Sequence, residues 1–139
     1  ELGLKYWSGI ELEQDRFKAY EWFDKAALLN YPPAQYHLAK MFLEGDNVLQ
    51  DTTKALELLR AAAKSGFAEA QCELGIIMWQ GKYADKDLSK AFAWLNLAAS
   101  RDSIRAQNLI PTLLTQMSQL QIMEGQKFSR QLHQETKAS

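Results

Sequence analysis

Residues 34–70 read AQYHLAKMFLEGDNVLQDTTKALELLRAAAKSGFAEA, and this stretch decides the fold because it is a complete copy of a unit that recurs along the chain. Its residues Ala34, Leu38, Met41 and Phe42 stand at i, i+4, i+7 and i+8, which is the spacing of one apolar face of a helix. A second stretch with the same kind of face follows Asp51. The copy therefore predicts two helices joined by a short loop.

The unit repeats with a period of 36 residues, which Gly9, Gly45 and Gly81 mark. The other landmarks in the same register are Asp15, Asp51 and Asp87; Lys18-Ala19, Lys54-Ala55 and Lys90-Ala91; Ala26-Ala27, Ala62-Ala63 and Ala98-Ala99; and Ala34-Gln35, Ala70-Gln71 and Ala106-Gln107. A fixed period of this length is typical of stacked helical hairpins. We expect one all-α solenoid of helix-loop-helix repeats, with a partial repeat at 1–33, repeats at 34–69 and 70–105, a divergent repeat and capping helix at 106–135, and a polar tail at 136–139.

Each copy carries residues that suit helix ends. The recurring glycine is predicted to end the first helix, because glycine tolerates the left-handed conformation. The recurring aspartate is predicted to cap the second helix, which then ends at Asn30, Gly66 or Asp102. Pro32 and Pro33 suit the first turn of the next helix. Ala39 and Gly75 are small enough to let a neighbouring helix approach closely.

The fourth copy departs from the pattern after Ala106-Gln107. Pro111 falls where the small residues stood, and Met117 replaces the glycine. We expect a capping helix from Ser118, which an array needs because its last repeat would otherwise expose an apolar face. Its array face is predicted as Ile122, Met123, Gly125 and Leu132, and its solvent face as Gln121, Lys127, Arg130 and Gln131. The polar residues after Leu132 are expected to fray.

Composition excludes several classes of function. The chain has 139 residues and a formal net charge of −1, with 16 basic and 17 acidic residues, so it lacks the basic stripe that nucleic-acid binding needs. No stretch approaches the roughly 20 apolar residues of a membrane span. Cys72 is the single cysteine, so no internal disulfide can form. The chain starts at Glu1, part-way through a unit, and we expect upstream residues to have been removed, which leaves the compartment open between bacterial envelope and cytoplasm.

The repeat resembles a known family. The pattern A-x-x-x-L-[GA]-x-x-[YFM]-x-x-G, then an apolar loop residue, then D-x-x-K-A-x-x-[WL]-[FL]-x-x-A-A resembles the Sel1-like repeat, a relative of the tetratricopeptide repeat. The third copy carries it at Ala70, Leu74, Gly75, Met78, Gly81, Asp87, Lys90, Ala91, Trp94, Ala98 and Ala99. The ending Met117 to Gln126 is similar to the terminal helix of many bacterial members. The resemblance implies an α-solenoid that acts as an adaptor or scaffold, without catalytic chemistry in the repeats.

Motifs for catalysis or metal binding were not found in the sequence. His37 and His133 lie in different elements, and neither has a second ligand at i+3 or i+4. There is no phosphate-binding glycine loop and no nucleophile elbow. We expect a protein that is not an enzyme and that holds no cofactor or metal.

The face of the first helix opposite its core stripe is the predicted binding surface. Tyr36, Lys40 and Leu43 lie about 160 to 240 degrees round the helix from the core stripe, at about 100 degrees per residue. These positions are predicted to line a concave surface that holds a segment of another protein, with His37 beside them. The same register gives Leu4 and Trp7 in the first copy, Cys72, Ile76 and Trp79 in the third, and Asn108, Thr112 and Thr115 in the fourth.

Alternatives remain for this surface and for the function. Trp7, Ile76 and Trp79 could instead pack between adjacent helices, as aromatic stripes at helical spacing usually do. The stretch from Cys72 to Gln80 is apolar nearly all round, so a peptide, an upstream repeat or a second copy of the chain must cover its outer side. The chain could also be a cell-envelope enzyme, a saccharide or small-molecule binder, or a weak homo-oligomer.

Overall fold

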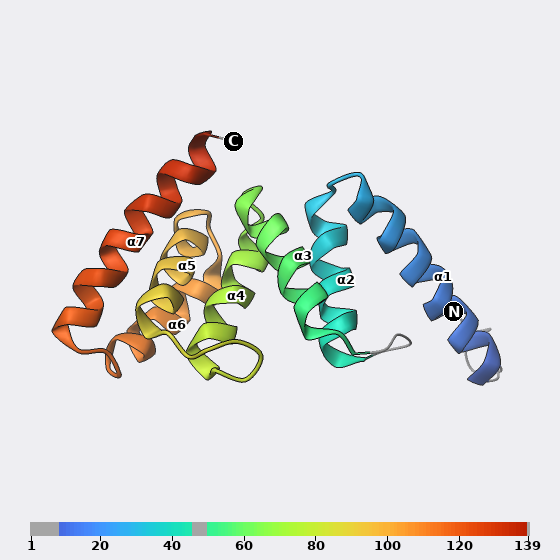
Figure 1. The fold of residues 1–139 in the computed structure, drawn as a ribbon, viewed down its shortest axis with the longest axis horizontal. Coiled ribbons are helices and arrows are strands. Elements are labelled where there is room, and N and C mark those ends of the chain that lie inside the picture. The colour runs from blue at the N-terminus through green and yellow to red at the C-terminus, as the bar shows by residue number, and fades with distance from the viewer. Residues whose placement is uncertain (1–8, 46–49, 139) are drawn as a thin grey trace. The chain divides into compact units, whose positions relative to one another are not determined.

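The computed structural model describes residues 9–45 and 50–138, and over these residues it contains seven α-helices and no β-strand (Figure 1). The predicted all-α class is confirmed, because the helices follow one another as an α-solenoid. They are α1 (Gly9–Leu28), α2 (Pro32–Glu44), α3 (Thr52–Lys64), α4 (Ala68–Gln80), α5 (Leu88–Ser100), α6 (Ile104–Leu114) and α7 (Gln119–Ala138).

The chain divides into two compact units after Leu58, within α3. In the first unit α1 packs on α2 through aromatic rings. The Tyr20 ring meets the Phe42 ring edge-on at 6.2 Å between centroids, and Phe23 stacks on His37 at 5.3 Å. In the second unit α5 is the central helix, because it contacts α4, α6 and α7.

The predicted helix ends are confirmed in the second and third copies. Gly45 and Gly81 end α2 and α4 with φ of 72° each, in the left-handed region. The Asp87 carboxylate accepts a hydrogen bond from the Lys90 backbone N–H at 3.0 Å, and Asp51 accepts one from Lys54 at 3.1 Å. The turns after the second helices use the predicted left-handed positions, with φ of 62° at Asn30, 99° at Gly66 and 69° at Asp102.

The first copy departs from the prediction. Asp15 was expected to cap the second helix after a loop, but α1 begins at Gly9 and runs unbroken through Asp15 to Leu28. Residues 10–14 read IELEQ and contain neither proline nor a second glycine. Isoleucine, glutamate, leucine and glutamine all tolerate a helix interior, so this segment is helical where the third copy forms a loop. The prediction of a loop with a cap at Asp15 is therefore wrong, and the helix predicted to end at Gly9 lies outside the described residues.

Close helix packing in the second unit depends on small residues. A Cβ atom built on Gly75 would lie 2.7 Å from Leu95 Cγ, so α4 and α5 approach as closely as the sequence predicted. Gly125 does the same between α7 and α5, where a Cβ would lie 2.8 Å from Phe92 Cδ2. The third copy therefore packs on the capping helix through α5.

The capping helix begins as predicted. Ser118 Oγ accepts from the Gln121 backbone N–H at 3.1 Å, and Gln121 Oε1 accepts from the Ser118 backbone N–H at 2.9 Å. This reciprocal pair is a capping box. Its first turn is therefore held by two side-chain hydrogen bonds.

Two details of α7 differ from the expectation. Met123 was predicted to face the array but is 62% exposed, whereas Ser129 is buried and accepts from Asn96 Nδ2 on α5 at 2.7 Å. Ser129 therefore lies on the face of α7 that packs on α5, where Asn96 supplies its polar partner, whereas Met123 lies outside this face. The residues after Leu132 continue the helix to Ala138 instead of fraying, and His133 Nε2 lies 3.2 Å from Ser100 Oγ on α5.

Candidate binding cavity between α4 and α6

A cavity of about 490 Å³ opens between α4 and α6 in the second unit. Its walls combine apolar and cationic side chains. The lining residues are Ile76, Trp79 and Gln80 of α4, Lys86 of the loop that follows it, and Arg105 and Leu109 of α6. The cavity therefore lies on the face of α4 that the sequence predicts as a binding surface.

Trp79 is the largest side chain of the cavity wall, and its ring is held in place. The indole N–H donates to Gln116 Oε1 at 2.9 Å, just after the end of α6. Trp79 and Ile76 are half-buried, and both pack against the core formed by Cys72 with residues of α5 and α6. The ring thus borders the core on one side and the cavity on the other.

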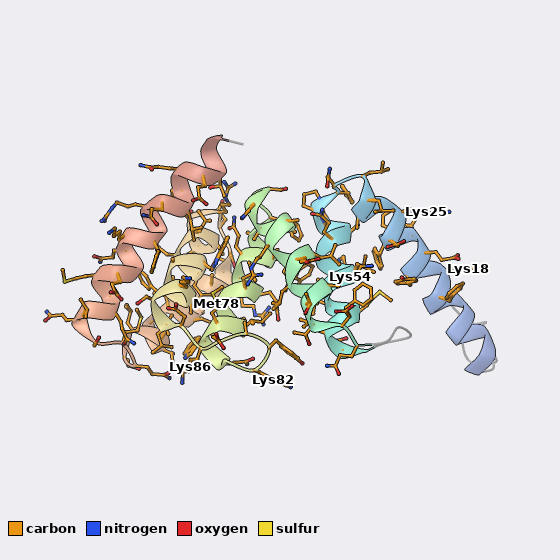
Figure 2. The ribbon with its side chains drawn as sticks, in the orientation of Figure 1. Lys18, Lys25, Lys54, Met78, Lys82 and Lys86 are labelled. Atoms are coloured by element: carbon orange, nitrogen blue, oxygen red, sulfur yellow. The ribbon has the colours of Figure 1, made fainter. Side chains whose placement is uncertain are left out.

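The positive charge of Arg105 at the cavity is partly compensated by the Glu73 carboxylate. Arg105 Nη1 lies 3.5 Å from Glu73 Oε1, which is close enough for an ion pair but makes no hydrogen bond, since this oxygen has no hydrogen-bond partner among the described residues. Figure 2 shows Lys82 and Lys86 on the loop between α4 and α5. Lys86 is exposed, so the mouth of the cavity carries a positive charge that faces water.

Burial raises the pKa of the Cys72 thiol above its ordinary value, although Arg105 acts in the opposite direction. The thiol is therefore neutral at pH 7. No cluster of three or more histidine, cysteine or acidic side chains occurs among the described residues. His133 is engaged by Ser129 and Ser100, so it holds α7 to α5.

The residues predicted to form the binding surface fall into three groups. Ile76 and Trp79 line the cavity. Tyr36, Leu43 and Cys72 are buried, at 7%, 5% and 1% exposure. Leu4 and Trp7 lie outside the described residues.

The polar members of the predicted surface are arranged around aromatic rings. Lys40 is half-buried, and its ammonium lies 5.7 Å from the centroid of the Tyr36 ring. His37 is exposed and stacks on Phe23. These residues belong to the first compact unit.

Sequence reasoning missed the α6 wall of the cavity. The repeat register assigned Asn108, Thr112 and Thr115 to this face, and all three are exposed. The cavity is lined instead by Arg105 and Leu109, which lie one turn apart. The repeat gave no signal for this pair, because the register positions of Leu109 in the third and second copies hold the polar residues Glu73 and His37.

None of the described helices is both long enough and apolar enough to cross a membrane.

Comparisons with known proteins place the repeat and the fold. The sequence model of the Sel1 repeat matches residues 1–31, 32–67 and 68–103. A protective antigen of uropathogenic Escherichia coli strains, described as displaying an SLR fold, is 29% identical, with a TM-score of 0.85 over 89% of this chain and 27% of that chain. A Sel1 repeat protein from Oxalobacter formigenes is 26% identical, with a TM-score of 0.61 over 66% of this chain and 37% of that chain. The present chain therefore spans well under half the length of either protein. No curated protein matches significantly.

Proposed function

The chain belongs to the Sel1 repeat family, whose members are generally protein-interaction modules, and from this premise we propose that it is a non-catalytic adaptor that binds a segment of a partner protein between α4 and α6. The fold of this family is typically an interaction scaffold. The cavity lined by Trp79 is the observation that carries the proposal.

The size and lining of the cavity support a peptide ligand. Binding cavities have volumes of roughly 300 to 1,000 Å³ and combine apolar walls with a few polar groups. The volume of about 490 Å³ and the wall of Ile76, Trp79 and Leu109 fit this description. Tryptophan is enriched among the residues that contribute most to binding at protein interfaces. The hydrogen bond to Gln116 holds the ring in place beforehand, which lowers the entropy lost on binding.

The charges at the cavity favour a segment that carries carboxylates. Lys86 and Arg105 are the ionisable groups among the described residues that line it, and both are cationic. Charges at the edge of an interface mainly increase the association rate and set the choice of partner. A hydrolase would need an acid, a base or a nucleophile converging on the same space, and this lining supplies no carboxylate, imidazole, hydroxyl or thiol.

Affinity capture with paired variants tests the proposal. The chain is used as bait in three forms: wild type, Lys86→Glu/Leu109→Asp, and the control Lys127→Glu/Leu120→Asp. The control makes the same two changes on α7, where Lys127 is exposed and Leu120 is 64% exposed. We expect a protein captured by the wild type to be lost from the cavity variant, with at least a tenfold weaker Kd when it is purified and titrated, and to be retained by the control.

Circular dichroism and the melting temperature of each variant show whether the fold is intact. If the folded cavity variant retains its partner as well as the wild type, the partner binds elsewhere and the proposed site is wrong. Equal losses in both variants would indicate a non-specific effect of charge.

A further inference from the structure

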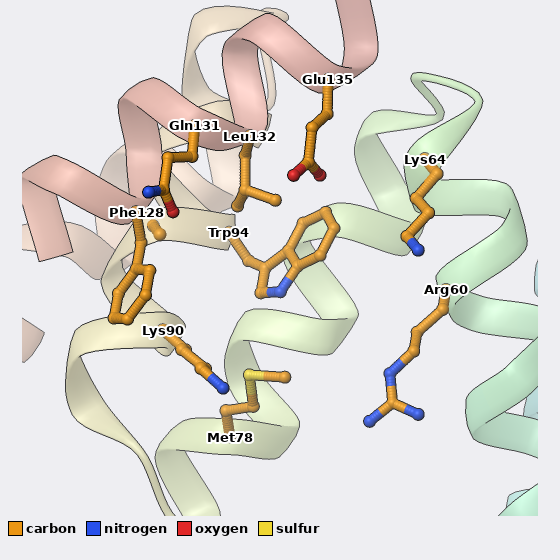
Figure 3. A pocket seen from close by; sticks show the side chains of 10 residues that line it. Arg60, Lys64, Met78, Lys90, Trp94, Phe128, Gln131, Leu132 and Glu135 are labelled. Carbon is orange, nitrogen blue, oxygen red and sulfur yellow. The ribbon is translucent and has the colours of Figure 1, made fainter. Parts of the chain in front are cut away.

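A second cavity, of about 270 Å³, lies in the second unit between α3, α5 and α7 (Figure 3). Met78 contributes to its wall from α4, whereas Ile76 and Gln80 of the same helix line the first cavity. Met78 is two residues from each of them, so at about 100 degrees per residue it lies about 160 degrees round α4 from both. The two cavities therefore use opposite faces of α4.

The apolar wall of this cavity centres on Trp94. The ring is 7% exposed, and Figure 3 shows it between Leu132 of α7 and Met78 of α4. Phe128 of α7 adds a second aromatic side chain. The Trp94 indole N–H makes no hydrogen bond within the described residues, and it is not among the buried polar atoms that lack a partner, so it is open to the cavity. A ligand in the cavity can therefore accept a hydrogen bond from it.

The rim of the cavity is positively charged. Arg60, Lys64 and Lys90 contribute to the lining, against one carboxylate, that of Glu135. Arg60 is exposed and has no ion-pair partner among the described residues. The Lys90 ammonium lies 5.8 Å from the centroid of the Phe128 ring, so it remains beside the apolar wall. The chain as a whole carries a net charge of −1, so this excess of cations is local.

We propose that this second cavity binds a short acidic segment of another protein. Arg60 and Lys90 pair with its carboxylates, and the Trp94 indole N–H donates to one of its backbone carbonyls. An apolar side chain of the segment packs on Met78, Phe128 and Leu132. The site is independent of the cavity between α4 and α6, and either one can fail without the other.

The volume of the cavity selects this class of ligand. A volume of about 270 Å³ holds roughly nine water molecules at about 30 Å³ each. It has room for one large side chain with its flanking backbone. The charges on its rim then require acidic neighbours on that segment.

Nuclear magnetic resonance of the tryptophan indole groups tests the proposal on the full chain. The chain has four tryptophans, so each indole N–H gives a separate signal, which single Trp→Phe variants assign. The probes are the blocked peptide acetyl-Glu-Asp-Leu-Glu-Asp-amide and its basic counterpart acetyl-Lys-Lys-Leu-Lys-Lys-amide. We expect the acidic peptide to shift the Trp94 signal saturably, and the basic peptide to leave it unchanged. The Trp79 signal should move less, because its N–H is already bonded to Gln116.

Charge reversal gives the second arm of the experiment. Arg60→Glu/Lys90→Glu should weaken binding of the acidic peptide at least tenfold, whereas Lys127→Glu/Arg130→Glu, the same change at positions of α7 that line neither cavity, should not. All four side chains are exposed, and a glutamate at position 90 stands where a capping box places one, three residues after Asp87. Arg60→Gln repeats the test with a milder change.

Three results would overturn the proposal: no shift of the Trp94 signal with the acidic peptide, an equal response to the basic peptide, or undiminished affinity in the folded Arg60 variants. If the Trp79 signal alone shifts, the first of these results holds, and acidic segments bind in the first cavity instead.

Discussion

The Cys72 thiol is buried where α4, α5 and α6 meet. Leu95 and Ala98 of α5 and Ala106 and Leu113 of α6 belong to the same core cluster. The side chain is 1% exposed, so ionisation would place a negative charge in an apolar environment. Arg105 reduces this penalty only in part, and the pKa of the thiol is raised.

The raised pKa predicts how stability depends on pH. The thiol is protonated in both states below about pH 8.5, the pKa of a cysteine in an unfolded chain, so its contribution to stability is fully present there. Above that pH the unfolded chain loses the proton first, and stability falls until the pH passes the folded pKa. We expect Cys72→Ala to be less stable at pH 7 by about 1 kcal/mol but to lose less stability between pH 8 and 10. Urea unfolding followed by circular dichroism measures both, and parallel pH profiles would contradict the assignment to Cys72.

At the scale of one element, α7 shows how a helix outside the repeat register is fixed to the array. Gly125 allows it to approach Phe92 of α5, and polar bonds then set its position. Ser89 Oγ donates to the Gln121 carbonyl at 3.0 Å, and Asn96 Nδ2 donates to Ser129 Oγ at 2.7 Å. The contact therefore combines close backbone packing with specific hydrogen bonds.

Replacing Gly125 by alanine tests whether close packing outweighs helix propensity. Alanine is favoured over glycine within a helix by about 1 kcal/mol. The new methyl would lie 2.8 Å from Phe92 Cδ2 and 3.1 Å from the Ser89 carbonyl, and overpacking of this kind costs about 1 to 3 kcal/mol. We expect a net loss of about 1 kcal/mol in urea unfolding. Gln126→Ala, at the exposed neighbouring position, is the control and should change stability little; a gain in stability for Gly125→Ala would show that α7 shifts freely on α5.

At the scale of the whole molecule, the core is built separately in the two compact units. Leu38 of α2 is buried in the first unit, with 1% of its surface exposed. Leu95 of α5 is buried in the second unit, with 0% exposed. Stability in repeat proteins is approximately the sum of terms for each repeat and its neighbours. Local unfolding should therefore follow the two units.

Hydrogen exchange measured by mass spectrometry tests this division. Leu95→Ala should cost about 2 to 5 kcal/mol of packing and raise exchange in α4 to α7 more than in α1 and α2. Leu38→Ala is the matched variant and should give the reverse pattern. Uniform exchange in both variants would mean that the array unfolds as one cooperative unit.

The features that were predictable from the sequence depend on local backbone chemistry. The left-handed ends at Gly45 and Gly81 and the aspartate caps at Asp51 and Asp87 need only a few neighbouring residues, and the 36-residue period places them. Membership of the Sel1 repeat family followed from the same landmarks and is confirmed.

The features that were missed depend on contacts that do not recur from one copy of the repeat to the next. The unbroken α1 arises where one copy replaces loop residues by helix formers. α6 begins in register with α4, but it carries Arg105 and Leu109 at the positions of Glu69 and Glu73, and these two side chains line the first cavity. The second cavity needs α7, which has no counterpart in the other copies. A period predicts only the contacts that recur, so these residues could not be assigned before the structure was known.

The continuous α1 also bears on protein engineering. A designer who wishes to concatenate modules from this chain needs cassettes that carry both of their own hairpin turns. Residues 68–103, with Gly81 and Asp87 at the inner turn and Asp102 at the outer one, form such a cassette. The first copy, whose inner turn is replaced by helix, would instead act as a rigid rod and is suited to serve as a terminal extension.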